Sequence, residues 1–389
     1  MKKRNDIRKT TRRDGKQLSA WACRSSFSPL SLFTLSLLSL FTLTLFLSSC
    51  SAIDEDLSDC GTDYTLDYEL QLVTNLNTEL QTQLTAKTDI SVASVLRTHL
   101  GNIFTDYAHD VDLSFYDTQG DSTRLEHDEH IMDASQHSYT LYIPRQKYMH
   151  LAVANIVNNP LVDLAHEKNC HTAMLKQEFT NGTDTISSHT TGLFTARESM
   201  EMIEGINQTF NVHLYIANCA AALTIDPRGE DVSSIKVYTT GFATQFNICD
   251  STYTFAEKDP IVEATPIHND NDTLLCYCSV NFPSREPNNI NNGTRVPLYN
   301  NKSTRTVIET EEPFVSQPDE NSLWEYHVYV TKADGKTTET KLSIRKPLRA
   351  GQLMILKCWL ANNGAVVTQN PEVGTSVTLD WKGGLSIDY

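Results

Sequence analysis

Hydrophobic and polar residues alternate along much of this chain. In the first such run, Tyr64–Val73, the apolar Leu66, Tyr68, Leu70 and Leu72 are separated mainly by acidic and polar residues. Successive side chains of a β-strand point to opposite faces of a sheet, so a period of two predicts a strand with one buried face. The same pattern predicts further strands at 111–115, 139–143, 148–157, 209–217, 220–225, 235–238, 253–255, 274–280, 324–330, 337–344, 353–360 and 377–381.

A β-hairpin is the strongest local prediction. Apolar residues alternate through Trp324–Val330 and polar and apolar residues alternate through Thr337–Ile344, with Asp334-Gly335 between the two runs. Asp-Gly readily adopts the positive φ angles of a tight hairpin turn, so the two runs are expected to pair in antiparallel fashion.

Helical periodicity is rare. Apolar residues recur at three- and four-residue spacing from Val92 to Phe104, which predicts an amphipathic helix. A second, short helix is predicted at Glu198–Glu204, ended by Gly205. Many short strands with few short helices favour an all-β fold built from β-sandwiches.

The N-terminal region differs in composition from the rest. Residues 1–49 contain nine Lys or Arg residues, and the run 30–47 that follows them consists only of Leu, Phe, Ser and Thr, which is typical of a signal peptide. The run ends in Leu47-Ser48-Ser49-Cys50, which resembles a bacterial lipobox. On this interpretation Cys50 becomes the acylated first residue of a membrane-anchored protein. The alternative is an uncleaved signal anchor, because 18 apolar residues can just cross a bilayer.

The mature chain is long enough for two domains. Its 340 residues exceed the size of about 250–300 residues at which a single core stops growing. We expect a lipidated linker at 50–62, an N-terminal β-sandwich domain at 63–205 and a C-terminal one at 206–389.

Charge and cysteine content narrow the possible partners. The whole chain has a formal net charge of −16, and residues 1–49 carry +7, so the remainder carries −23. We therefore expect no nucleic-acid partner, since phosphate recognition needs a basic surface. Seven cysteines follow Cys50 without a Cys-x-x-Cys pair, and we expect mostly reduced thiols in the core. The cysteine content is also compatible with one disulfide, but the spacing of the cysteines does not identify its partners.

The sequence contains no familiar catalytic motif. It has no Gly-x-Gly-x-x-Gly, Walker or Gly-x-Ser-x-Gly segment. His166-Glu167 begins like a zinc-protease helix, but the second ligand position holds Cys170, and His171 lies one residue out of phase. We expect neither an enzyme nor a resident metal or cofactor.

A dense group of acidic residues and histidines lies at 126–137. Its members are Glu126, His127, Asp128, Glu129, His130, Asp133 and His137. These side chains could bind a divalent cation. We prefer the interpretation that this segment is an exposed acidic loop between two strands, because no flanking apolar residues would hold the side chains in place as ligands. Binding of a cation is kept as the alternative.

Three segments resemble a known family. They are the acidic start and first strand at 54–76, the segment 208–219 and the segment 238–244. Behind a lipidated cysteine, they resemble the anchor and accessory subunits of the fimbrillin-type pili of Bacteroidales. Asp54-Glu55-Asp56 also resembles the signal that sends lipoproteins of these bacteria to the outer face of the outer membrane.

The resemblance implies a fold and a role. It implies two tandem transthyretin-like β-sandwich domains, a lipid anchor at Cys50 and a surface-exposed position on the outer membrane. Members of that family anchor or terminate a fimbrium, contact stalk fimbrillin or accessory subunits through β-strands, and support cell adhesion. Stalk subunits exchange their first strand, whereas a lipidated subunit cannot release it and would end the polymer. The segment 377–381 is then a donor or edge strand, or simply the last strand of the second sandwich.

A glycan-binding β-sandwich lipoprotein is the alternative function. Such a protein stacks exposed aromatic rings on sugars, and the tryptophans of the mature chain are Trp324, Trp359 and Trp381. All three lie in predicted strands, which favours packing positions over sugar contacts.

Overall fold

The structure is a computed structural model, and it describes residues 64–379 apart from several gaps. The gaps are 74–77, 79, 83–89, 106–107, 120–123, 133–137, 158, 167, 178–184, 204–207, 257–258, 269–271 and 288–321. The chain divides into two units, Met1–Gly61 and Thr62–Tyr389, and all described residues belong to the second. The predicted signal peptide, the lipidation site Cys50 and the linker at 50–62 lie outside the described residues and stay predictions.

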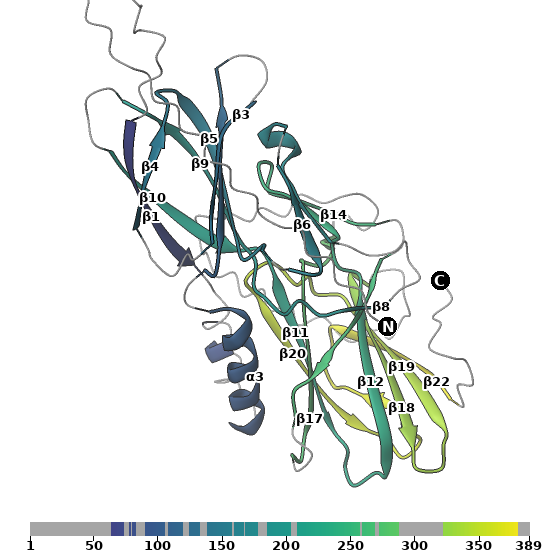
Figure 1. The fold of residues 1–389 in the computed structure, drawn as a ribbon. Helices are drawn as coiled ribbons and strands as arrows, with labels where there is room; N and C mark the ends of the chain where they lie inside the picture. Colours follow the sequence, from purple (N-terminus) through teal and green to yellow (C-terminus); the bar gives the residue numbers. More distant parts are fainter. Residues whose placement is uncertain are drawn as a thin grey trace, which may run out of the picture. The chain divides into compact units, whose positions relative to one another are not determined.

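A seven-stranded sheet contains most of the strands of the N-terminal half (Figure 1). Its order is β3-β2-β5-β9-β10-β1-β4. The bounds are β1 (Tyr64–Val73), β2 (Val111–Asp117), β3 (Arg124–Ile131), β4 (Ser138–Ile143), β5 (Lys147–Ala154), β9 (Phe194–Glu201) and β10 (Gln208–Ile216). The predicted first strand is confirmed: Leu66, Tyr68 and Leu70 of β1 are buried and the residues between them are exposed.

The predicted amphipathic helix is also confirmed, as α3 (Ile90–Ile103). Val92, Leu96 and Leu100 follow one another at four-residue spacing and form one buried stripe. They share a core with residues of β1, β2 and β10 and with Cys276 and Cys278. This core therefore joins one face of the seven-stranded sheet to strands from the second half of the chain.

A four-stranded sheet shares a second core with the seven-stranded sheet. Its order is β14-β13-β7-β6, with β6 (Val162–Ala165), β7 (Met174–Gln177), β13 (Gln245–Asn247) and β14 (Thr252–Thr254). The 3₁₀ helix η1 (Cys170–Thr172) precedes β7. Tyr116 and Leu151 of the large sheet pack with Leu175, Phe246 and Tyr253 of the smaller one.

The rest of the chain forms a sandwich of two further sheets. One has the order β16-β17-β11-β20-β21 and the other β22-β19-β18-β12-β15-β8. The bounds are β8 (Thr185–Ser187), β11 (Cys219–Asp226), β12 (Val232–Thr240), β15 (Ile261–Glu263), β16 (Thr265–Pro266), β17 (Leu275–Asn281), β18 (Trp324–Lys332), β19 (Thr337–Ile344), β20 (Leu353–Leu360), β21 (Val366–Val367) and β22 (Val373–Thr378). Leu223 and Leu356 of the first sheet share a core with Val328, Leu342 and other residues of the second. The prediction of an all-β sandwich fold is confirmed.

The predicted hairpin is formed by β18 and β19. Its register runs from Trp324↔Ile344 to Thr331↔Thr337. Gly335 takes a φ of +81°, and the Asp334 carboxylate accepts the N–H of Lys336 at 3.0 Å. The Asp-Gly pair thus supplies both the positive φ and the side-chain hydrogen bond of the turn.

Two local predictions were wrong. The helix predicted at Glu198–Glu204 is not formed by its described residues, because those up to Glu201 continue β9 and pair with β5, and Glu204 lies outside the described residues. The loop predicted around Glu126–His130 is a strand, since Arg124–Ile131 forms β3 and pairs with β2. In both segments pairing with a neighbouring strand outweighs the local preference of charged residues for helix or loop.

The division into domains at residues 205 and 206 stays a prediction. The strand that would open the second domain, β10, belongs to the seven-stranded sheet, where it pairs with β9 and runs parallel to β1. The chain therefore leaves the first sheet after Ile216 and enters the five-stranded sheet at Cys219. In the described part of the chain, no helix combines the length and the apolar character needed to cross a membrane.

Candidate functional site

The open edges of the four sheets are the first candidate for interaction with another protein. An edge strand presents unpaired N–H and C=O groups that can pair with a further strand. Among the described edge strands, three have six or more residues: β3, β4 and β22. Charged residues fill β3, which discourages strand addition, whereas β4 and β22 carry no charge.

The backbone N–H groups of β22 point away from β19 at alternate residues. It pairs with β19 from Ile344↔Val373 to Glu339↔Thr378, and the N–H of Arg345 donates to the carbonyl of Glu372 at 3.1 Å. Because bonded and non-bonded pairs alternate in an antiparallel ladder, the N–H groups of Thr375 and Val377 point away from β19. Among the described strands, β22 has β19 as its neighbour on one side and none on the other, so it forms an edge of the six-stranded sheet (Figure 1).

Apolar side chains are exposed at the end of the same strand. Val373 lies in the core of the sandwich and is 2% exposed. Val377 lies on the same face of β22, yet it is 39% exposed, and Leu379 just beyond the strand is 53% exposed. Since a strand with alternating apolar residues would cover these groups, this edge has both the backbone and the side chains of a strand-addition site. In β4 the apolar residues of the core-facing side, Leu141 and Ile143, are already buried.

The first strand is held inside its sheet by a buried hydrogen-bond chain. The hydroxyl of Tyr68 on β1 lies 2.6 Å from Nε2 of His150, and Nδ1 of His150 lies 3.0 Å from the backbone carbonyl of Ser114. A carbonyl only accepts, so Nδ1 donates to it and Nε2 accepts from Tyr68. Burial lowers the pKa of His150 to about 3, which keeps its ring neutral, and the ring stacks on Phe115 at 4.3 Å between centroids.

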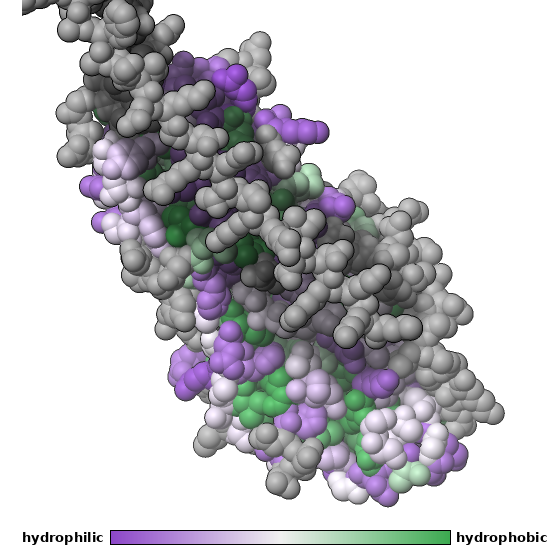
Figure 2. Space-filling view, in the orientation of Figure 1, coloured by the Kyte–Doolittle hydropathy of each residue, from purple (hydrophilic) through white to green (hydrophobic). Residues whose placement is uncertain are grey.

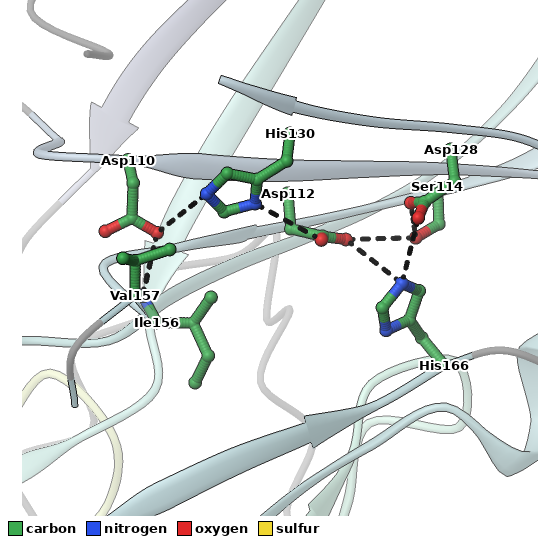
Figure 3. Close-up of polar contacts among 8 residues, drawn as sticks. All are labelled: Asp110, Asp112, Ser114, Asp128, His130, Ile156, Val157 and His166. Atoms are coloured by element: carbon green, nitrogen blue, oxygen red, sulfur yellow. Dashed lines mark hydrogen bonds and ion pairs between the residues drawn. The ribbon is translucent and has the colours of Figure 1, made fainter. Parts of the chain in front are cut away.

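A second candidate is an alternating row of carboxylates and imidazoles on β2, β3 and the end of β6 (Figure 3). His130 lies 3.8 Å from Asp110 and 3.4 Å from Asp112. His166 lies 3.7 Å from Asp112 and 3.3 Å from Asp128. In Figure 2 hydrophilic surface gathers near the end of the seven-stranded sheet where β3 and β5 are labelled in Figure 1.

The electrostatics of this row differ between its carboxylates. Burial raises the pKa of Asp112, and the nearby Asp128 charge adds to the effect, against the opposing influence of His166. The pKa of Asp128 is lowered, chiefly because His166 hydrogen-bonds to it. The N–H groups of Ile156 and Val157 both donate to Asp110 at 3.1 Å. Each carboxylate of the row therefore has hydrogen-bond donors or a histidine beside it.

Three atoms of this row could hold a divalent cation. Oxygens of Asp112 and Asp128 and a nitrogen of His166 lie within 4.8 Å of one another. Carboxylate and imidazole ligands suit several divalent metals. Each of these groups also has a polar partner within the row, so the row links β2, β3 and the segment after β6.

Sequence reasoning found part of this row. Of the predicted group, Asp128 and His130 join it, and His127 lies 3.6 Å from Glu129 beside it. Glu126 pairs instead with Arg124, and Asp133 and His137 lie outside the described residues. Asp110, Asp112 and Ser114 were missed, although their alternation with the predicted apolar positions of β2 placed them together on one face.

In its described residues, the segment that begins like a zinc-protease helix at His166 does not form an α-helix. His166 follows β6, and Cys170 and His171 open the three-residue η1. Of the described tryptophans, Trp324 is 1% exposed and donates its indole N–H to the carbonyl of Lys346, whereas Trp359 is half-buried and the guanidinium of Arg228 lies 4.4 Å from its ring centroid. Trp381 lies outside the described residues.

Comparisons with known proteins give distant structural likenesses. No family model matches the chain, and no curated protein matches its sequence. The structure is similar to the fimbrial anchor protein Mfa2 from Porphyromonas gingivalis, with 9% identity, a TM-score of 0.41 and coverage of 82% of this chain and 98% of that one. It is also similar to a candidate adhesin from Bacteroides ovatus, with 12% identity, a TM-score of 0.41 and coverage of 74% and 84%.

A third similar structure is a candidate polysaccharide-binding protein from Bacteroides thetaiotaomicron, with 9% identity, a TM-score of 0.42 and coverage of 79% and 96%. The structural neighbours are thus adhesion-type and fimbrial proteins of Bacteroidales. Likeness at this distance does not identify what the present chain binds.

Proposed function

We propose that this protein is a lipid-anchored, non-catalytic subunit on the outer membrane that anchors, terminates or assembles a fimbrium and thereby supports adhesion. The proposal joins the lipobox at Cys50 and the sequence resemblance to a physical feature of the fold. That feature is the edge of β22 that has no neighbour among the described strands, with outward N–H groups at Thr375 and Val377 and exposed side chains at Val377 and Leu379.

The partner that fits this edge is an extended strand of another fimbrial subunit. Its backbone would pair with β22, and its apolar side chains, recurring at every second residue, would cover Val377 and Leu379. Such a contact needs no cofactor, and its specificity comes from register and side-chain fit. A stalk fimbrillin or an accessory subunit supplies the strand.

The position of β1 supports an end-of-polymer role. β1 pairs on both sides, with β10 and β4, and its buried Tyr68 is bonded to His150. A strand fixed on both sides and tethered through the linker to a lipid is not available for exchange. The subunit would accept a strand at β22 without donating its own first strand.

The described tryptophans do not favour the glycan-binding alternative, because Trp324 is buried and Arg228 lies over one face of the half-buried Trp359. Among the described residues, the aromatic ring that is open to solvent is Tyr142 on β4, which is 61% exposed. A glycan array with strong binding that depends on Trp359 would nevertheless favour this alternative over strand addition.

Replacement of the predicted lipidation site tests the anchoring role. In Cys50→Ala, acyl chains cannot be attached, so we expect loss of radiolabelled palmitate and release of fimbrial material into the medium. Cys60→Ala is the matched control, because it removes a nearby thiol outside the lipobox. Fimbriae that stay cell-bound in Cys50→Ala, with palmitate still incorporated, would contradict the anchoring role.

A further inference from the structure

Two cysteines far apart in the chain meet in the core beside the four-stranded sheet. Cys170 opens η1 before β7, and Cys249 lies two residues after the end of β13. Their sulfur atoms are 3.2 Å apart. Both residues are almost completely buried, at 1% and 3% exposure, so neither thiol is placed to meet a soluble substrate.

The backbone around the pair is fixed from both sides. The N–H of Ile248 donates to the carbonyl of Ala173 at 3.0 Å, and the side-chain amide of Asn247 donates to the carbonyl of His171 at 2.6 Å. Arg197 on β9 donates to the carbonyl of Cys249. The sulfurs are therefore adjacent because the β7–β13 pairing places them so, and a bond of about 2.05 Å would need a shift of little more than 1 Å.

We propose that Cys170 and Cys249 form a disulfide in the exported protein. The two thiols lose two protons and two electrons, and the oxidant is a disulfide, carried by a thiol–disulfide oxidoreductase or by oxidised glutathione, which is reduced to two thiols. The proposal takes export as its premise, on the basis of the predicted signal peptide. Export brings the chain into a compartment where disulfides persist.

The bond would tie together strands from the two halves of the chain. The closed loop between Cys170 and Cys249 contains β9, β10, β11 and β12. It therefore includes the crossing from the seven-stranded to the five-stranded sheet. Covalent closure of a long loop stabilises a fold mainly by restricting the unfolded chain.

The buried thiols bear on when the bond forms. The hydrogen bond with Cys170 raises the pKa of Cys249, and burial raises it further. Since the thiolate is the reacting species, exchange in the folded protein is slow. The disulfide is expected to form while the chain folds and to resist reductants afterwards.

A soft metal ion is the competing occupant of this cluster. Nδ1 of His171 lies 3.8 Å from the Cys249 sulfur, and the two sulfurs and this ring could form three ligands. Tetrahedral zinc with Zn–S bonds of about 2.3 Å would hold two sulfurs about 3.8 Å apart. The observed 3.2 Å is shorter, and His171 is engaged by the Asp250 carboxylate at 3.4 Å, so the geometry favours the disulfide.

Peptide mapping of the full chain tests the proposal directly. Protein purified from exporting cells is unfolded with iodoacetamide and no reductant, digested and analysed by mass spectrometry. We expect a cross-linked peptide pair containing Cys170 and Cys249, with Cys358 alkylated as the internal control. A second sample refolded in a glutathione redox buffer gives the same link and separates this result from any failure of export or of fimbrial assembly. Quantitative alkylation of both cysteines in the two samples would overturn the proposal, as would stoichiometric bound zinc.

Variants provide an independent readout. Cys170→Ala, Cys249→Ala and the double variant are each expected to lower Tm by the same amount, about 5–10 °C, because any one of them removes the single cross-link. Wild-type protein refolded with reductant should match them, and Cys358→Ala should still respond to reductant. If the two single effects add up in the double variant, the link is absent; if the variants do not fold, the peptide map of the wild type decides.

Discussion

At the residue scale, His150 connects three strands of the seven-stranded sheet. It lies on β5, accepts from Tyr68 on β1 and donates to Ser114 on β2. Because every polar atom of the ring is used, its neighbours are constrained by geometry as well as by packing. The ring lies in the apolar core, where a charged group would be costly, so the stability of the fold depends on the ring being neutral.

Removal of the tyrosine hydroxyl should measure this constraint. Tyr68→Phe leaves Nε2 of His150 buried without a donor, and we expect a loss of about 1–3 kcal/mol in the free energy of unfolding. The double variant Tyr68→Phe/His150→Phe removes both partners and should recover part of the loss. Denaturant titration measures these losses. If the loss of the double variant exceeded the sum of the losses of the two single variants, the assignment of the hydrogen bond would be contradicted.

Acid should destabilise the fold between about pH 6.5 and 5. Burial lowers the pKa of His150 to about 3 and that of His189 to about 4, whereas both titrate near 6.5 in the unfolded chain. The unfolded state therefore binds more protons in this window, and stability falls as the pH falls, by about 2 kcal/mol per histidine at pH 5 relative to pH 8. Unfolding midpoints across this range check the slope, and the Tyr68→Phe/His150→Phe variant should lose about half of it.

At the element scale, Gly241 shows how β12 ends against its neighbour. Its φ is +96°, and a Cβ there would lie 2.6 Å from the backbone of Trp324. Gly335 in the hairpin turn has a φ of +81° with nothing within 4 Å of an added Cβ. The two glycines thus share the conformational requirement but differ in available space.

This pair allows a controlled substitution. Gly335→Ala should cost about 1–2 kcal/mol through the left-handed backbone alone. Gly241→Ala adds a backbone clash and should cost at least about 3 kcal/mol, lowering Tm correspondingly. Equal losses in the two variants would show that close approach to Trp324 does not limit this position.

Elements with a strong local pattern were predictable from sequence, and elements defined by distant pairing were not. β1, α3 and the β18–β19 hairpin each carry an uninterrupted periodicity or a turn signal. β3 and the end of β9 are rich in charged residues, and only their pairing with β2 and β5 makes them strands. The parallel pairing of β10 with β1 joins residues far apart in the chain, which no local pattern reveals.

The candidate sites follow the same division. The alternation in β2 could have placed Asp112 and Ser114 on one face, but their meeting with His166 depends on where β6 lies. The segment 377–381 was predicted as a donor, edge or last strand. The observed strand is β22, Val373–Thr378, which lies at an edge and is the last strand of the described residues, whereas residues 380–381 lie outside them. Which of its N–H groups face outward follows only from its register with β19.

At the scale of the whole molecule, the proposed function combines a predicted lipid anchor at Cys50 with the sheet edge formed by β22. β1 is fixed between β10 and β4, while β22 has a described neighbour on one side only. On the proposed function, such a subunit accepts a strand at β22 and keeps its own first strand. We therefore propose that β22 is the contact with the rest of the fimbrium.

The most direct test removes one outward N–H from β22. Val377→Pro deletes a donor at the outer edge of β22 without removing a hydrogen bond of the ladder to β19, and Val377→Ile is the matched control that keeps both the N–H and an apolar, branched side chain. Tagged wild type and both variants are isolated from the cell envelope and run on gels with and without boiling, after their surface levels and Tm are shown to be similar. We predict a heat-sensitive ladder of subunits for wild type and Val377→Ile, and a single monomeric band for Val377→Pro. An unchanged ladder in Val377→Pro, or no ladder in wild type, would contradict the account.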